Sequence, residues 1–297
     1  MTEPRQRMRW LCIRSANACS DYSQIVAVYF RKYLTASISR NCIEERMASS
    51  SKSAAAARLP EIRARLFDRE RDPPSQIENL LTRKQQVEFG NIATMLDYRR
   101  GGITIFSEGE DAHFVYSVVA GIVRISRHSD GGRRQVLAFM LPGDIFGLPD
   151  SGIYVNSAEV ACPSSLCRVP WVQLRELMMR EPAMQLNLLV KVAYDLREAQ
   201  RRIMILGQQN TFQRLASFLL DFIQHRAFFD EERAQLTLPL TRFDMADYLG
   251  TAPETVARGF LRLEREGLIC RVAPRVIEIR SLAGLRQLQG QSRRKES

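Results

Sequence analysis

The sequence predicts an α+β fold in which a β-rich domain precedes a long amphipathic helix and a mainly helical C-terminal domain. Short β-prone runs separated by turn residues occupy residues 98–169. Apolar residues then recur at helical spacing over residues 183–206. Two short helices followed by two strands are predicted for residues 241–279. With 297 residues, of which 45% are hydrophobic, the chain is long enough to bury one or two cores.

Composition divides the chain into four parts. Residues 1–75 contain 14 basic and 8 acidic residues and a Ser- and Ala-rich stretch typical of a flexible linker. We expect a flexible basic extension there, with Met47 as an alternative translation start. We further expect the β-rich domain over residues 76–180, the long helix over 181–208 and the C-terminal domain over 209–297.

The positive charge is concentrated at the two ends of the chain. Residues 76–240 hold 18 basic and 18 acidic residues, whereas residues 241–297 hold 11 basic and 7 acidic residues. A basic C-terminal region favours contact with phosphates, whose neutralisation supplies much of the nonspecific affinity for nucleic acid. The alternative is a basic surface that only confers solubility.

Apolar runs in this sequence are too short to cross a membrane. The apolar segment at residues 25–33 is much shorter than the roughly 18 residues that a span requires, and it includes Arg31 and Lys32. It leaves an N-terminal signal or anchor as an alternative. We expect a cytoplasmic protein without a membrane partner.

A helix-turn-helix pattern with a hairpin occupies the C-terminal region. Thr241 begins a Ser/Thr-x-x-acid helix start, and Gly250 ends the short helix that follows. Pro253 suits the first turn of a second helix, which Gly267 ends. Strands are then predicted at residues 268–272 and 275–279. Two short helices joined by a Gly-containing turn and followed by a wing are typical of DNA-binding domains.

Glu254 and Arg258 lie one turn apart on the second of these helices and therefore share a face. Val256, Phe260 and Leu263 point to the other side and form a core face. Arginine can donate two bonds to guanine, and a carboxylate can accept from cytosine, so the pair suits a G·C step in a major groove. The simpler interpretation is an i,i+4 salt bridge on a solvated helix.

The long helix carries an apolar stripe that could seat a second copy of the chain. Charged residues, among them Lys191 and Asp195, occupy the remaining positions. Packing of the stripe on the chain's own β-rich domain is the alternative, and one helix could do both. The predicted dimerisation residues are Leu186, Leu189, Val190, Ala193, Leu196 and Ile203.

Several motifs give the chain, across roughly residues 76–290, a close resemblance to the CRP/FNR family of cyclic-AMP receptor and fumarate-nitrate reductase regulators. The motifs are Gly109-Glu110, Gly121 with Val123-Arg124, Arg134-Gln135, residues 142–147 (PGDIFG), and the helix from Glu254 to Arg258. Within that family, Phe146-Gly147, Ser157-Ala158-Glu159 and residues 247–250 (DYLG) look most similar to the FixK-like regulators of low-oxygen genes.

This resemblance implies a fold and a function. It implies an N-terminal β-roll of the cyclic-nucleotide-binding, jelly-roll type, a dimerisation helix and a C-terminal winged helix-turn-helix. It further implies a homodimer that binds palindromic promoter DNA and recruits RNA polymerase. We expect a transcription activator of low-oxygen or nitrogen-oxide response genes.

DNA-contact roles can be assigned to residues of both helices. We expect Arg258 to donate to guanine and Glu254 to accept from cytosine. The phosphate-contact candidates are Thr255, Arg262, Thr241 and Arg242. Ala257 stands where FNR-like and FixK-like helices typically carry a serine that helps to read the outer thymine. A methyl group cannot donate or accept, so we expect a weaker preference for the outer base.

We expect no cofactor. Leu148 and Asn156 stand where cyclic-AMP binders of the family carry a glutamate and an arginine, so cyclic AMP is disfavoured. An iron-sulfur cluster needs four thiolates, and no cysteine lies between Cys42 and Cys162. The three histidines show no pairing for haem. Cys270, at the start of the wing, is a redox candidate, although a strand-packing role is favoured.

Two classes of function remain. The favoured class is a dimeric transcription regulator. The alternative is a small-molecule or redox sensor whose DNA binding is secondary or gated by an unidentified ligand. The sequence offers no phosphate-binding loop and no pairing of nucleophile and base, so we do not expect an enzyme.

Overall fold

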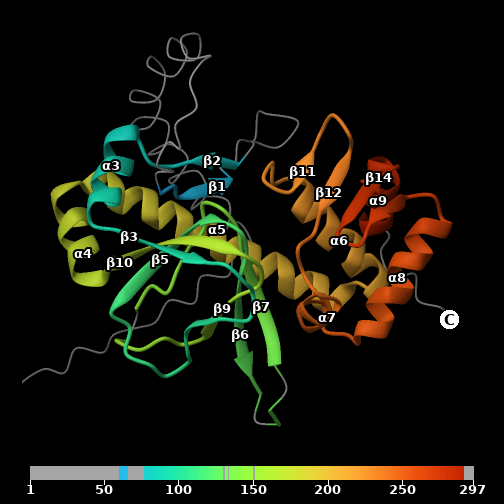
Figure 1. The fold of residues 1–297 in the computed structure, drawn as a ribbon, viewed down its shortest axis with the longest axis horizontal. Helices are drawn as coiled ribbons and strands as arrows, with labels where there is room; N and C mark the ends of the chain where they lie inside the picture. Colours follow the sequence, from blue (N-terminus) through green and yellow to red (C-terminus); the bar gives the residue numbers. More distant parts are fainter. Residues whose placement is uncertain (1–59, 66–76, 130, 133, 150, 291–297) are drawn as a thin grey trace, which may run out of the picture. The chain divides into compact units, whose positions relative to one another are not determined.

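The computed structural model describes residues 60–65, 77–129, 131–132, 134–149 and 151–290. The predicted extension up to residue 59 and the alternative start at Met47 lie outside these residues. The described part comprises a β-roll, a long helix and a winged helix-turn-helix, in that order (Figure 1). The predicted α+β class is therefore confirmed.

Two four-stranded antiparallel sheets form the β-roll, in the orders β3-β10-β5-β8 and β4-β9-β6-β7. Their strands are β3 (Thr94–Tyr98), β4 (Thr104–Phe106), β5 (Phe114–Ala120), β6 (Val123–His128), β7 (Arg134–Met140), β8 (Ile145–Phe146), β9 (Ser157–Val160) and β10 (Ser164–Pro170). Strands β4 to β9 lie within residues 98–169, where short β-prone runs are predicted. Aromatic rings fill the interior: Phe106 stacks on Tyr154 at 3.7 Å between ring centroids, and Tyr116 stacks on Phe146 at 5.4 Å.

The turn between β5 and β6 requires glycine. Gly121 has φ +86°, a conformation that side chains rarely adopt. A Cβ atom there would lie 2.1 Å from the Ser164 hydroxyl oxygen and 2.5 Å from the Pro163 carbonyl oxygen. The same hydroxyl accepts a hydrogen bond from the Ile122 amide at 3.1 Å. Gly121 thus lets β5 and β6 pack directly beside the start of β10.

Residues 60–65 belong to the folded body, so the predicted boundary at residue 75 lies too late. Strand β1 (Arg63–Arg65) pairs antiparallel with β2 (Ile77–Asn79). Ala64 of this short strand and Ile62, the residue just before it, are buried on the same side. The Arg63 amide donates to the Gly143 carbonyl at 2.7 Å. A strand of three residues within a charged segment is too short for a pattern to reveal.

Three helices pack with the β-roll, and the third one leads out of it. They are α3 (Arg83–Asn91), α4 (Trp171–Arg180) and α5 (Pro182–Gln208), and α5 closely matches the predicted long helix. Lys191 of α5 was expected among the solvent-facing charges, but its side chain is only 1% exposed. Its ammonium binds the carboxylates of Asp144 at 2.7 Å and Asp195 at 2.6 Å.

Opposite charges explain why a lysine is tolerated at this buried position. Burial opposes the charged ammonium, but Asp144 and Asp195 together raise the pKa of Lys191 above its usual range. Burial also raises the pKa of Asp195 to about 6, because the Lys191 ammonium offsets only part of the cost. Asp144 belongs to the turn before β8, so this ion pair fixes α5 to the β-roll.

The C-terminal domain surrounds a second core. It contains the helices α6 (Thr211–Ile223), α7 (Arg242–Leu249), α8 (Pro253–Arg265) and α9 (Leu282–Gly290), and a sheet ordered β11-β12-β14-β13. Its strands are β11 (Phe229–Asp230), β12 (Gln235–Thr237), β13 (Ile269–Ala273) and β14 (Val276–Ile279). The predicted hairpin wing is confirmed as β13 and β14. Leu215, Phe218 and Leu219 of α6 lie buried in the same cluster as the apolar face of α8.

Replacing Lys191 with methionine should destabilise the protein by about 2–4 kcal/mol, because two partly buried carboxylates would lose their counter-ion. Urea unfolding of the full chain measures this loss. Lys84→Met is the matched control, since Lys84 is an exposed lysine that also pairs with two carboxylates. Equal unfolding free energies for both variants would contradict the anchoring role of Lys191.

Candidate DNA-binding interface

The start of α7 is capped as predicted. The Thr241 hydroxyl accepts from the Asp244 amide at 3.1 Å, and the Asp244 carboxylate accepts from the Thr241 amide at 3.3 Å. Gly250 ends α7 in the left-handed conformation, with φ +64°. The short turn before Pro253 then sets the direction of α8.

Helix α8 has one buried and one exposed face. Val256, Phe260 and Leu263 are buried, whereas Glu254 and Arg258 are exposed. No ion pair joins Glu254 to Arg258 among the residues that the structure describes; instead, the Arg258 guanidinium donates to the Thr255 hydroxyl at 3.1 Å. The salt-bridge interpretation is therefore not what this structure shows, and both charged groups face outward.

Gly259 lets α8 lie close to α6. A Cβ atom at this position would approach a methyl group of Leu215 to 2.8 Å, closer than real contacts allow. Glycine in a helix interior costs about 1 kcal/mol relative to alanine. The close approach of α6 and α8 explains why glycine is present despite this cost. It also means that α6 supports α8 from the side opposite its exposed face.

The four phosphate-contact candidates differ in their surroundings. Thr241 is exposed at the start of α7. The Arg242 guanidinium lies over the Phe260 ring at 3.8 Å from the centroid, and burial, with a smaller contribution from Arg271, lowers its pKa. Arg262 donates to Glu266 at 2.8 Å. Thr255, half-buried, accepts from Arg258. The Thr241 hydroxyl itself donates to the Asp244 carboxylate at 2.6 Å.

The wing contributes two exposed arginines to this interface that were not among the predicted site residues. Arg271 is exposed and pairs with Glu264 of α8 at 2.6 Å, while Arg275 is exposed at the hairpin turn. A proline next to an arginine in the predicted turn was the available signal. Cys270 is half-buried in β13, and its redox role stays a prediction.

The described cysteines of the β-roll are buried thiols. Cys162 and Cys167 are both free and buried. Burial raises the pKa of the Cys167 thiol to about 11. Cys12, Cys19 and Cys42 lie outside the described residues. Within the described ranges, no cluster of three or more His, Cys, Asp or Glu residues could hold a metal ion.

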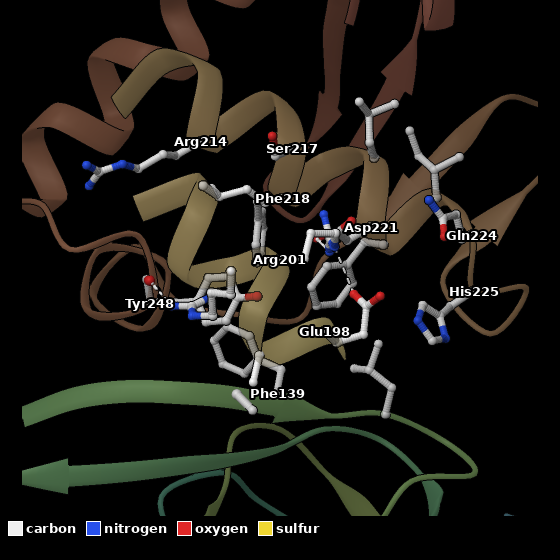
Figure 2. A pocket seen from close by; sticks show the side chains of 18 of the residues that line it. Phe139, Glu198, Arg201, Arg214, Ser217, Phe218, Asp221, Gln224, His225 and Tyr248 are labelled. Carbon is white, nitrogen blue, oxygen red and sulfur yellow. Dashed lines mark hydrogen bonds and ion pairs between the residues drawn. The ribbon is translucent and has the colours of Figure 1, made fainter. Parts of the chain in front are cut away.

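A cavity of about 430 Å³ lies between β7, α5 and α6 (Figure 2). Phe139 of β7 faces Phe218 of α6 and Tyr248 of α7, with ring centroids 6.3 and 5.0 Å away. The Arg201 guanidinium binds Glu198 of its own helix at 2.9 Å and Asp221 of α6 at 2.8 Å. Aromatic side chains of the β-roll and of the C-terminal domain therefore meet at this cavity, beside the ion pairs of Arg201.

Comparison with known proteins identifies both halves of the chain. Residues 97–181 match the model of the cyclic nucleotide-binding domain, and residues 213–288 match that of the Crp-like helix-turn-helix domain. Together these models cover more than half of the sequence. None of the helices in the described ranges is long and apolar enough to span a membrane.

Relatives include characterised regulators and a solved structure. The nitrogen fixation regulation protein FixK of Azorhizobium caulinodans is 35% identical over 185 residues, which is 62% of this chain and 75% of that protein. The transcriptional activatory protein AadR of Rhodopseudomonas palustris is 34% identical over 56% of this chain and 69% of its own length. The structure of FixK2 from Bradyrhizobium japonicum matches with a TM-score of 0.63 and 32% identity, over 67% of this chain and 98% of that one.

These matches agree with the two-domain architecture and with the exposed face of α8. They cover the β-roll and the winged helix-turn-helix in the order found here. The chain belongs to the CRP/FNR family of DNA-binding transcription regulators and is similar to its FixK-like members.

Proposed function

We propose that this regulator acts as a homodimer that reads a palindromic promoter site with its two α8 helices. The observation that carries this proposal is the exposed pair Glu254 and Arg258, opposite the buried face of α8. A two-fold dimer would present two such helices to major grooves about one helical turn apart. Selection of bound sites from random DNA tests the proposal, since palindromic half-sites at that spacing should emerge.

An exposed heptad seam on α5 supports dimerisation. Leu186, Leu189, Ala193, Leu196, Gln200 and Ile203 alternate in steps of three and four residues, and all six are exposed. Leu189, Leu196 and Ile203 are 64%, 59% and 69% exposed, which is unusual for large apolar side chains on a single face. Seven-residue spacing is the pattern of a two-helix seam.

Two details refine the predicted dimer face. Val190 is half-buried and lies beside the seam rather than on it. Gln200 lies on the seam, where a polar residue can fix the register of paired helices at some cost in stability. Lys191 points the opposite way, toward Asp144 of the β-roll. The alternative of packing only on the β-roll therefore accounts for one face of α5 and leaves the seam uncovered.

Base recognition follows from the exposed face of α8. We assign Arg258 to guanine and Glu254 to cytosine, with Thr255, Arg262, Thr241 and Arg242 as phosphate contacts. The Arg262 to Glu266 pair is exposed, and exposed pairs are weak, so a phosphate could replace Glu266. Ala257 is exposed between the two base-reading residues, where it offers only a methyl group.

We assign the regulator an activating role in the cytoplasm, through RNA polymerase, at low-oxygen or nitrogen-oxide response genes. The names of two relatives support activation and nitrogen metabolism: one is a transcriptional activatory protein and the other a nitrogen fixation regulation protein. We further propose that neither a cyclic nucleotide, an iron-sulfur cluster nor haem is needed. Aromatic rings that fill the β-roll and the buried state of Cys167 support this proposal.

Arg258→Ala should weaken binding to the selected site by about 1–3 kcal/mol and relax the choice of base at one position of each half-site. Titration of wild type and variant with matched and singly mutated duplexes measures both effects. Arg265→Ala, an exposed arginine near the end of the same helix, is the control for general loss of positive charge. Full discrimination by Arg258→Ala would contradict the assignment.

Leu196→Glu should convert the dimer to a monomer, because it places two like charges opposite each other in an apolar seam. Sedimentation of the full chain measures the change, and we expect the dimer dissociation constant to rise about 100-fold or more. Met179→Glu on α4 replaces a side chain that is 71% exposed but lies away from the seam. A dimeric Leu196→Glu variant would refute the α5 interface.

Cyclic AMP should leave the melting temperature of the protein unchanged, because a ligand shifts stability only when it binds the folded state. Thermal unfolding with and without millimolar cyclic AMP measures this effect. The same experiment on the cyclic-AMP-dependent catabolite activator of another bacterium provides the positive control. A rise of several degrees for this chain would show that the nucleotide binds despite Leu148 and Asn156.

A further inference from the structure

An ion network joins the β-roll to the first helix of the helix-turn-helix. At its centre lies Asp244 of α7, whose side chain is 1% exposed. One carboxylate oxygen accepts from Arg124 of β6 at 2.6 Å and from Arg134 of β7 at 3.3 Å. The other accepts from the Thr241 hydroxyl at 2.6 Å. A single buried carboxylate therefore both caps α7 and binds the β-roll.

A second carboxylate extends the contact by one turn of α7. The Arg134 guanidinium donates to the Asp247 carboxylate through two nitrogens, at 2.9 and 2.7 Å. The neighbouring Gln135 amide donates to the Asp247 backbone carbonyl. Arg124 has a second carboxylate partner, because it also pairs with Glu159 of β9. Two arginines of the β-roll thus neutralise both acidic residues of α7.

This junction unites sequence motifs that no DNA-reading role explains. Arg124, the Arg134-Gln135 pair and Glu159 come from three separate strands of the β-roll. Asp247 begins the DYLG segment of α7. All of them belong to stretches that carry the resemblance to the family, yet they lie far apart in the sequence. The structure brings them together at one contact between sensor-like and DNA-binding domains.

We propose that Arg124 and Arg134 are positioning residues for DNA recognition. They hold α7 against the β-roll, and the short turn and shared core transmit that position to α8. They also neutralise Asp244 and Asp247 on the helix whose first residues, Thr241 and Arg242, are assigned to phosphates. Without the arginines, these two carboxylates would lose the counter-ions that hold α7 against the β-roll.

A double-mutant cycle on the full chain tests this role. The variants are Arg134→Ala, Asp247→Ala and the double replacement, and the ligand is the DNA site selected by the wild-type chain. Each single variant should bind that site about tenfold more weakly, and the double variant should bind no more weakly than Arg134→Ala, because that change already removes the contact with Asp247. Asp247→Asn, which keeps the side-chain size, should behave like Asp247→Ala.

A control separates the positioning role from a general loss of positive charge. Arg127→Ala removes an arginine whose carboxylate partner, Glu108, lies within the β-roll at 2.6 Å, and it should retain wild-type affinity. Affinity within twofold of wild type for Arg134→Ala, tighter binding, or additive losses in the double variant would each overturn the inference. It rests on the proposed palindromic site: a wild-type chain that selects no site would overturn both, whereas normal binding by Arg134→Ala overturns this inference alone.

Discussion

The ion pair between Lys191 and Asp144 is the constraint on which the arrangement of the chain depends. It fixes one face of α5 to the β-roll although a buried ammonium is costly, and two carboxylates offset that cost. Because that face is occupied, the heptad seam on the other side points outward. One helix thereby serves two neighbours: its own β-roll on one side and, in the proposed dimer, a second copy on the other.

In the C-terminal domain, one face of α8 packs on the core and the opposite face carries the residues proposed to read bases. Gly259 and the apolar face of α8 allow close packing on α6, which leaves Glu254 and Arg258 exposed on a rigid element. Rigid support matters because base recognition depends on the direction in which a guanidinium donates. The side chains assigned to phosphates hold partners within the protein, and phosphate contacts position the protein without reading bases.

The β-roll is filled by aromatic rings, whereas open space lies at its boundary with the C-terminal domain. Phe106, Tyr116 and Tyr154 occupy the interior of the roll. The cavity beside Phe139 and Tyr248, in contrast, is bordered by β7 and by four helices, α5, α6, α7 and α9. The two halves of the chain thus meet at a boundary that combines this open space with the ionic contacts of Arg134.

The sequence by itself determined the local elements and the reading face. Thr241 and Gly250 specify where α7 begins and ends, and Pro253 specifies where α8 begins, because caps and breakers act over a few residues. The spacing of Glu254 and Arg258 specifies a shared face for the same reason. Only the tertiary structure decided the burial of Lys191, the place of β1 and the network around Asp244. Each of these features depends on partners tens of residues away in the sequence. A local pattern of apolar and charged residues does not indicate which distant side chains come into contact.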